Sequence, residues 1–222
     1  RQRQMCIRDR SNEDLFIMSI SMQNHGGYTE KYDNFDEKAR MLGINYPDVN
    51  QYLSLIHESD SALEYLISYF EKVDDPVEIV FFGDHQPSLS SSFYPYLNGK
   101  GLGGLTLSEL ENLYTVPFFI WTNYDSGKES VELTSLNYLS TLALERAGIA
   151  LPAYNQFLAD MMEEIPAVNS RGFYSKSQRK FLHVEDAAGE DAKWLKNYEI
   201  LQYNNMFDKR NKSGLFFPYL KQ

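Results

Sequence analysis

Short apolar runs, each followed by a polar turn, mark the first half of the chain. Residues 15–22 (LFIMSISM) and 77–82 (VEIVFF) are almost continuously apolar, which predicts two buried strands. Between them, apolar positions recur at spacings of three, four and seven, which predicts a helix over residues 50–72. A strand, a helix and a second strand in this order are typical of a βαβ unit, so we expect the strands to be parallel.

The second half of the chain combines one more apolar run with several helical patterns. Residues 116–121 (VPFFIW) predict a third strand, and the proline near its start favours a sheet edge or a strand beginning. Helical spacing of apolar positions predicts helices over residues 107–113, 136–147, 154–164 and 194–205. Together these elements indicate an α/β protein with a mainly parallel sheet and flanking helices.

Composition and charge narrow the class of protein. With 222 residues, 43% of them hydrophobic, the chain is long enough to fold around a substantial core. Its net charge of −10 repels phosphate backbones and argues against nucleic acid as a partner. No run approaches the roughly 20 apolar residues of a membrane span, so we expect these residues to form a soluble piece. The single cysteine, Cys6, has no partner for an internal disulfide.

The first ten residues differ from the rest of the chain. Residues 1–10 (RQRQMCIRDR) begin without Met, are rich in arginine and have neither helical nor strand periodicity. We expect this decapeptide to be a non-native or disordered leader, and the patterned sequence to begin in mid-protein at Ser11. A native basic linker is the alternative interpretation.

Two polar turns at predicted strand ends hold the candidate site residues. His25 follows the first strand, and Asp84 and His85 follow the second after Gly83, which we expect to permit a sharp turn. In α/β sheets, ligands bind outside the carboxyl ends of the strands. A carboxylate beside an imidazole is a plausible pair of metal ligands, and a histidine can donate to a phosphate or sulfate oxygen or act as a general acid. On pattern alone, polar strand ends hydrogen-bonded to their loops explain these residues equally well.

Three motifs that follow one another in a fixed order, together with a tail segment, favour a functional role for these residues. The motifs are residues 22–28 (MQNHGGY), 52–60 (YLSLIHESD) and 81–87 (FFGDHQP), and the tail segment is residues 198–204 (YEILQYN). Together they resemble the C-terminal part of the lipoteichoic acid synthase family of phosphoglycerol transferases. That family is a sulfatase-like branch of the alkaline phosphatase superfamily. Several motifs in the same order are far more specific than any one of them.

The resemblance implies a domain organisation and roles for the three site residues. Residues 11–207 correspond to the C-terminal part of a sulfatase-like catalytic domain, followed by a tail over residues 208–222. Asp84 and His85 match the family's metal-binding residues, with one divalent cation, typically manganese. His25 matches the histidine that contacts the substrate phosphate. The nucleophilic Thr and a metal-binding Glu of the family precede this segment, so we assign no catalytic residue here and expect the isolated chain to be inactive.

The resemblance also implies a reaction and a location. A Thr attacks the phosphodiester of a phosphatidylglycerol-type lipid, diacylglycerol leaves, and glycerol phosphate passes to a growing polymer acceptor. The expected place is the outer face of a bacterial cell membrane, with the anchor in an N-terminal part that precedes this segment. Two alternatives remain open: a sulfatase or phosphodiesterase hydrolase of the same superfamily, and a non-catalytic binding module that retains the fold.

Overall fold

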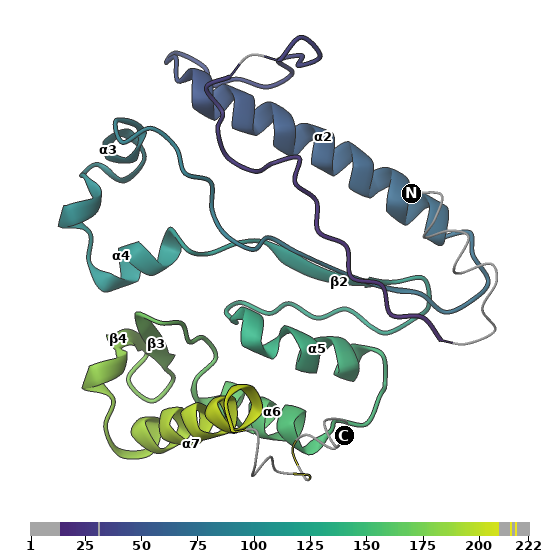
Figure 1. Cartoon of the computed structure of the whole chain (residues 1–222), viewed down its shortest axis with the longest axis vertical. Helices are drawn as coiled ribbons and strands as arrows, with labels where there is room; N and C mark the ends of the chain where they lie inside the picture. Colours follow the sequence, from purple (N-terminus) through teal and green to yellow (C-terminus); the bar gives the residue numbers. More distant parts are fainter. Residues whose placement is uncertain (1–13, 31, 209–213, 215, 217–222) are drawn as a thin grey trace. The chain divides into compact units, whose positions relative to one another are not determined.

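The structure is a computed structural model, shown in Figure 1. It describes residues 14–30, 32–208, 214 and 216. The leader predicted at residues 1–10 and most of the tail predicted at residues 208–222 lie outside the described residues.

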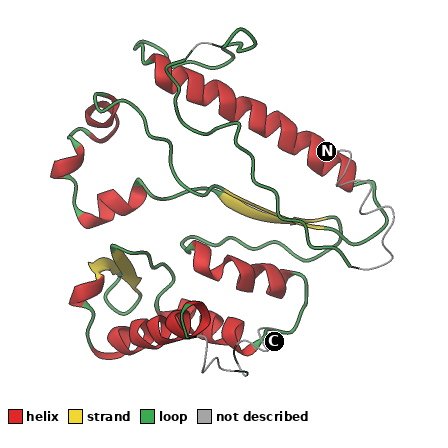
Figure 2. Cartoon of the chain, in the orientation of Figure 1, coloured by secondary structure: helices red, strands yellow, loops and turns green. Residues whose placement is uncertain are grey.

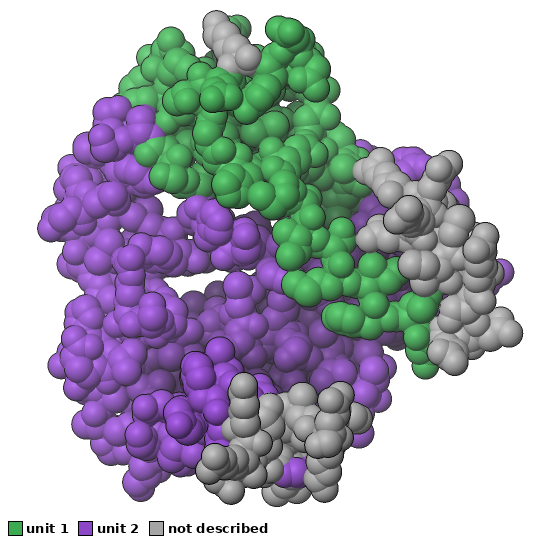
Figure 3. All heavy atoms as spheres, viewed as in Figure 1, with its two compact units in different colours: residues 1–63, 87–89 green, residues 64–86, 90–222 purple. Residues whose placement is uncertain are grey.

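The chain forms two compact units, which Figure 3 distinguishes by colour. The first unit comprises residues 1–63 and 87–89, and the second comprises residues 64–86 and 90–222. Helices account for most of the regular structure, and the described strands form two-stranded sheets (Figure 2). The α-helices are α2 (Pro47–Phe70), α3 (Phe93–Asn98), α4 (Leu107–Asn112), α5 (Leu139–Arg146), α6 (Ala153–Glu164) and α7 (Gly189–Met206). The 3-10 helices are Leu102–Gly104, Leu136–Tyr138 and Val184–Asp186. The strands are β1 (Glu78–Phe82), β2 (Phe118–Thr122), β3 (Gly172–Ser175) and β4 (Lys180–His183).

The N-terminal part of α2 organises the first unit. The helix begins at Pro47, where the missing backbone N–H of proline costs no helical hydrogen bond. Ser54, which is buried, accepts hydrogen bonds from the backbone N–H groups of Lys38 and Ala39, each at 3.1 Å. These bonds hold the preceding loop along the helix. The helix predicted over residues 50–72 is therefore confirmed, with both ends displaced by a few residues toward the N-terminus.

Residues 15–22 do not form the buried strand that their apolar sequence predicts. They are irregular, and the exposed fractions of their apolar side chains run from 41% at Leu15 to 93% at Phe16. A strand needs a hydrogen-bonded neighbour along at least one edge, and no described strand pairs with this segment. The prediction was wrong because an apolar run shows a preference for burial but does not supply the neighbouring strand.

The strands predicted at residues 77–82 and 116–121 are confirmed, and they pair with each other. β1 and β2 are antiparallel, with Glu78 opposite Thr122 and Phe82 opposite Phe118. The mainly parallel sheet is therefore corrected for the described residues, since β3 and β4 are also antiparallel. The order of elements along the chain predicted that residues 15–22 form a parallel partner of β1. Its partner is instead β2, which comes later in the sequence.

The core of the second unit lies among its C-terminal helices and the hairpin of β3 and β4. Its fully buried side chains are Tyr138, Leu158, Met161, Ile165 and Phe173. Trp194, Leu195 and Tyr198 of α7 pack against this cluster. Ser175 of β3, also buried, donates a hydrogen bond of 2.7 Å to Asp191 of α7. Apolar contact and one buried polar bond thus join the hairpin to the helices.

The helices predicted in the second half of the chain are confirmed by α4, the Leu136–Arg146 helical segment, α6 and α7. The hairpin of β3 and β4 had no sequence prediction, because its strands are four residues long and mixed in polarity. None of the described helices combines the length and the apolar character that crossing a membrane requires.

Candidate metal and phosphate site

Asp84 and His85 lie directly beyond the end of β1, with side chains open to solvent. Their exposed fractions are 76% and 66%. One carboxylate oxygen of Asp84, Oδ1, accepts a hydrogen bond of 3.0 Å from the backbone N–H of His85. The second oxygen, Oδ2, lies 3.7 Å from Nε2 of His85. The two side chains therefore present an oxygen and a nitrogen toward the same small region.

The hydrogen bond at the other ring nitrogen sets the chemistry of His85. Nδ1 of His85 lies 2.9 Å from the carbonyl oxygen of Gln86. A carbonyl only accepts, so this contact is a hydrogen bond when Nδ1 carries the proton, and in the neutral ring Nε2 then keeps its lone pair. Histidine ligands of metals are commonly held in this way, by a backbone carbonyl on the second nitrogen.

The separation of the two donor atoms fits a shared divalent cation. Metal–oxygen and metal–nitrogen bonds of about 2.0–2.2 Å place neighbouring ligands roughly 2.8–3.6 Å apart at octahedral or tetrahedral angles. The 3.7 Å between Asp84 Oδ2 and His85 Nε2 is just above that span, so a small rotation of either exposed side chain would bring both atoms onto one cation. Asp84 and His85 can therefore supply two ligands of one metal site.

These two ligands form a partial donor set. Within residues 14–30 and 32–208, no three His, Cys, Asp or Glu side chains come together in a way that could hold a metal ion. Divalent cations in proteins take four or more ligands, some of which can be water or substrate oxygens. The geometry therefore supports two ligands of a metal ion. The remaining ligands would have to come from other groups, such as water or substrate oxygens.

Backbone and side-chain contacts fix the loop that carries the pair. Gln86 donates from Nε2 to the carbonyl oxygen of Thr115, and the N–H of Gly83 donates to the carbonyl oxygen of Pro117 at 3.1 Å. Both acceptors belong to the segment that leads into β2. No role was predicted for Gln86 or Thr115 from the sequence. The position of Gln86, between His85 and a proline, is the one sequence feature that could have indicated its importance.

Gly83 is needed here for a reason other than the predicted sharp turn. It is not among the described glycines with positive φ, so its conformation is open to other residues. A Cβ atom at this position would lie 3.1 Å from Cβ of Val116 and 3.4 Å from its Cγ1. The glycine therefore lets the backbone lie close to Val116, and a methyl group here would displace Val116 by a few tenths of an ångström.

Replacing Gly83 with Ala is expected to lower the free energy of unfolding by about 1–3 kcal/mol, because the added methyl overpacks against Val116. Denaturant titration measures the loss. Replacing Val116 with Gly in the same chain should recover part of it, since both the Cβ atom at 3.1 Å and the Cγ1 atom at 3.4 Å are then absent. Strictly additive losses in the double variant would show that the two residues are not in contact.

His25 lies in the first unit, in the turn after residues 15–22, and its side chain is exposed. Its backbone N–H donates to the carbonyl oxygen of Met22 at 3.2 Å. The neighbouring Asn24 exchanges hydrogen bonds of 2.9 and 3.2 Å with Ser59 of α2, which ties the turn to the helix. The structure thus brings Asp84 and His85 together and holds His25 in the other unit. A role for His25 at a phosphate group remains a prediction.

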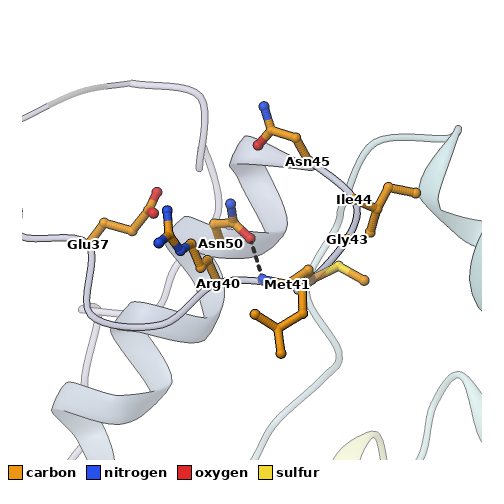
Figure 4. A pocket seen from close by; sticks show the side chains of 8 residues that line it. Glu37, Arg40, Met41, Gly43, Ile44, Asn45 and Asn50 are labelled. Atoms are coloured by element: carbon orange, nitrogen blue, oxygen red, sulfur yellow. Dashed lines mark hydrogen bonds between the residues drawn. The ribbon is translucent and has the colours of Figure 1, made fainter.

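A pocket of about 570 Å³ opens in the first unit beside the start of α2 (Figure 4). Its lining residues are Glu37, Arg40, Met41, Leu42, Gly43, Ile44, Asn45 and Asn50. Asn50 accepts a hydrogen bond of 2.9 Å from the backbone N–H of Met41, which closes the loop over the helix. None of the three predicted site residues is among those that line this pocket.

Comparison with known proteins identifies a family for most of this chain. A model of the Sulfatase family matches residues 2–149, a range that contains His25, Asp84 and His85. The predicted resemblance to sulfatase-like proteins is thereby confirmed.

Two curated relatives come from Rhizobium meliloti (strain 1021). A "Putative cyclic beta-1,2-glucan modification protein" is 22% identical over 226 aligned residues, which cover 94% of this chain and 34% of the relative. The "Capsular polysaccharide biosynthesis protein RkpI" is 38% identical over 84 residues, which cover 38% of this chain and 14% of that protein. The chain therefore spans about a third or less of the length of these relatives.

A solved structure shares the fold. The phosphoglycerol transferase GacH of Streptococcus pyogenes, in complex with sn-glycerol-1-phosphate, superimposes with a TM-score of 0.56 at 20% identity. The superposition covers 83% of this chain and 42% of that one. At this identity the likeness concerns the fold, and it confirms the predicted α/β class.

Proposed function

This chain belongs to the sulfatase family, and on that premise we propose that it is part of a metal-dependent phosphoglycerol transferase. The proposed donor is a phosphatidylglycerol-type lipid, and the product is a cell-envelope polymer or glycan that carries glycerol phosphate. One observation carries the proposal: Asp84 Oδ2 and His85 Nε2 lie 3.7 Å apart, and the Gln86 carbonyl at Nδ1 leaves Nε2 free to bind a metal.

Each of a few groups has a distinct role in the proposed reaction. Asp84 and His85 hold one side of a divalent cation, manganese by resemblance, which when bound stabilises negative charge on the phosphate oxygens. His25 donates a hydrogen bond to a non-bridging phosphate oxygen. A Thr hydroxyl from sequence outside these 222 residues attacks phosphorus, and diacylglycerol leaves with the proton. A hydroxyl group of the acceptor then takes the glycerol phosphate and releases the Thr.

The names of similar proteins support this choice among sulfatase-family reactions. GacH is a phosphoglycerol transferase solved with sn-glycerol-1-phosphate. The two Rhizobium meliloti relatives are named for glucan modification and for capsular polysaccharide biosynthesis. A carbohydrate of the cell envelope is therefore a reasonable acceptor beside the glycerol phosphate polymer. An acceptor of either kind favours a location at the outer face of a bacterial membrane, with the anchor in another part of the protein.

The experiment is a turnover assay on the whole protein that contains this chain. Phosphatidylglycerol labelled in its headgroup is supplied with Mn²⁺ and an envelope glycan or glycerol phosphate oligomer. We expect diacylglycerol release together with label in the acceptor. Label released only as free glycerol phosphate would favour a phosphodiesterase, and hydrolysis of sulfate esters without transfer would favour a sulfatase. Lack of any turnover together with lack of metal binding would favour the non-catalytic module.

A further inference from the structure

A buried carboxylate fixes the turn that precedes β3. Glu111 of α4 is only 6% exposed, and its Oε2 accepts a hydrogen bond from the side-chain amide of Asn169. The other end of that amide, Oδ1, accepts from the backbone N–H of Arg171 at 2.8 Å and of Gly172 at 3.1 Å. One side chain therefore connects α4 to both backbone N–H groups of the turn.

Gly172 restricts the turn further. A Cβ atom at this position would lie 2.7 Å from the carbonyl oxygen of Leu182, closer than side chains tolerate. The glycine thus lets β3 lie tightly against β4, where Gly172 is opposite His183. Arg171, the residue just before, is held at a defined place although it is exposed.

Arg171 lies over an aromatic ring and forms no ion pair within the part of the chain that the structure describes. Its Cζ lies 4.2 Å from the ring centroid of Tyr114, which is also exposed. A cation over a ring face is attracted to the ring, which favours one position of the guanidinium. None of the ion pairs among the described residues involves Arg171. An exposed guanidinium that none of these ion pairs neutralises is well suited to bind an anion.

A short series of contacts connects Arg171 with the loop that carries the metal ligands. Tyr114 immediately precedes Thr115, whose carbonyl oxygen accepts the hydrogen bond from Gln86. Gln86 in turn follows His85, and all of these residues belong to the second unit. The stacked arginine is therefore linked to the Asp84–His85 loop through one aromatic residue and one hydrogen bond.

We propose that Arg171, stacked on Tyr114, binds a phosphate oxygen of the ligand whose reacting group lies at Asp84 and His85. The ligand class is a glycerol phosphate ester, either a lipid headgroup or a soluble or polymeric glycerol phosphate. The inference rests on the proposed function insofar as it takes the ligand to carry phosphate. The planar fork of the guanidinium matches two phosphate oxygens, and stacking holds it in place before the ligand arrives.

The test follows the arginine Nε–H signals of the 222-residue chain by NMR during titration with sn-glycerol-1-phosphate, and separately with phosphatidylglycerol vesicles. We expect a saturable shift at Arg171. Arg171→Gln should weaken the apparent affinity at least about fivefold, and Arg171→Lys should weaken it less, since it keeps the charge but loses the fork. Arg179→Gln is the matched control: it removes the same charge from an exposed position in the turn between β3 and β4 and should leave the affinity unchanged.

The possible outcomes separate this inference from the proposed function. A shift with the soluble ester identifies a glycerol phosphate site, and a shift with vesicles alone identifies a lipid headgroup site; both support the role of Arg171. The role of Arg171 is overturned if its signal shifts with neither probe, or if Arg179→Gln weakens the apparent affinity as much as Arg171→Gln. Broadening of the His85 signals by Mn²⁺ should be the same in Arg171→Gln as in the wild type. If this broadening is lost only in Asp84→Asn, the metal site is supported even when the proposal for Arg171 fails.

Discussion

Replacing Asp84 with Asn is expected to lower the transfer activity of the whole protein at least about a thousandfold. The change keeps the shape of the side chain and removes the negative charge that would hold the cation. A bound metal contributes several kcal/mol to stabilising the transition state, and each 1.4 kcal/mol is roughly tenfold in rate. Headgroup transfer from labelled phosphatidylglycerol, measured as kcat/KM over a range of Mn²⁺ concentrations, gives the loss.

The matched control for that variant is Asp160→Asn. Asp160 is an exposed acid on α6 in the same unit, so its replacement changes the net charge equally and should leave kcat/KM within about twofold. Equal losses in the two variants would point to a general effect of charge. Full activity of Asp84→Asn would remove Asp84 from the metal site.

Replacing Phe173 with Ala is expected to lower the free energy of unfolding of the second unit by about 3–5 kcal/mol. Phe173 is fully buried among Tyr138, Leu158 and Ile165, so the truncation removes apolar contact and leaves a cavity. Typical domains have a total stability of only about 5–15 kcal/mol, so the variant should be close to unfolding at 37 °C. Urea denaturation followed by fluorescence reports the change, because Trp194 packs against this core.

Phe207→Ala provides the comparison for the core variant. Phe207 is 63% exposed at the end of α7, and its truncation should change stability by no more than about 0.5 kcal/mol. If both variants lost the same amount, Phe173 would not belong to a cooperative core.

The sequence was most informative where the interactions are local. Helix α2 was predicted because the apolar positions of a helix repeat within a few residues along the chain, whatever lies around it. The strands β1 and β2 were predicted for the same reason. Their antiparallel pairing was not, because the choice of partner depends on how the chain between Gly83 and Pro117 returns. The failure at residues 15–22 has the same origin.

In the candidate site too, local features were predictable and contacts between distant residues were not. Asp84 and His85 were predicted because they are adjacent in sequence and follow a strand directly. The direction of the His85 lone pair was not predictable, since it depends on the hydrogen bond between Nδ1 and the Gln86 carbonyl. Arg171 and Tyr114 escaped notice because they are far apart in sequence and meet only through the turn anchored on Glu111.

Binding of Mn²⁺ to the 222-residue chain, observed by paramagnetic broadening of NMR signals, tests most directly whether Asp84 and His85 are metal ligands. Low concentrations of Mn²⁺ should broaden the His85 ring signals selectively. Asp84→Asn should greatly reduce this broadening, while the signals of the exposed His57 and His183 stay sharp. Weak binding is expected, since two ligands form only part of a coordination shell. Broadening that is equal at all three histidines, or unchanged in Asp84→Asn, would contradict the account.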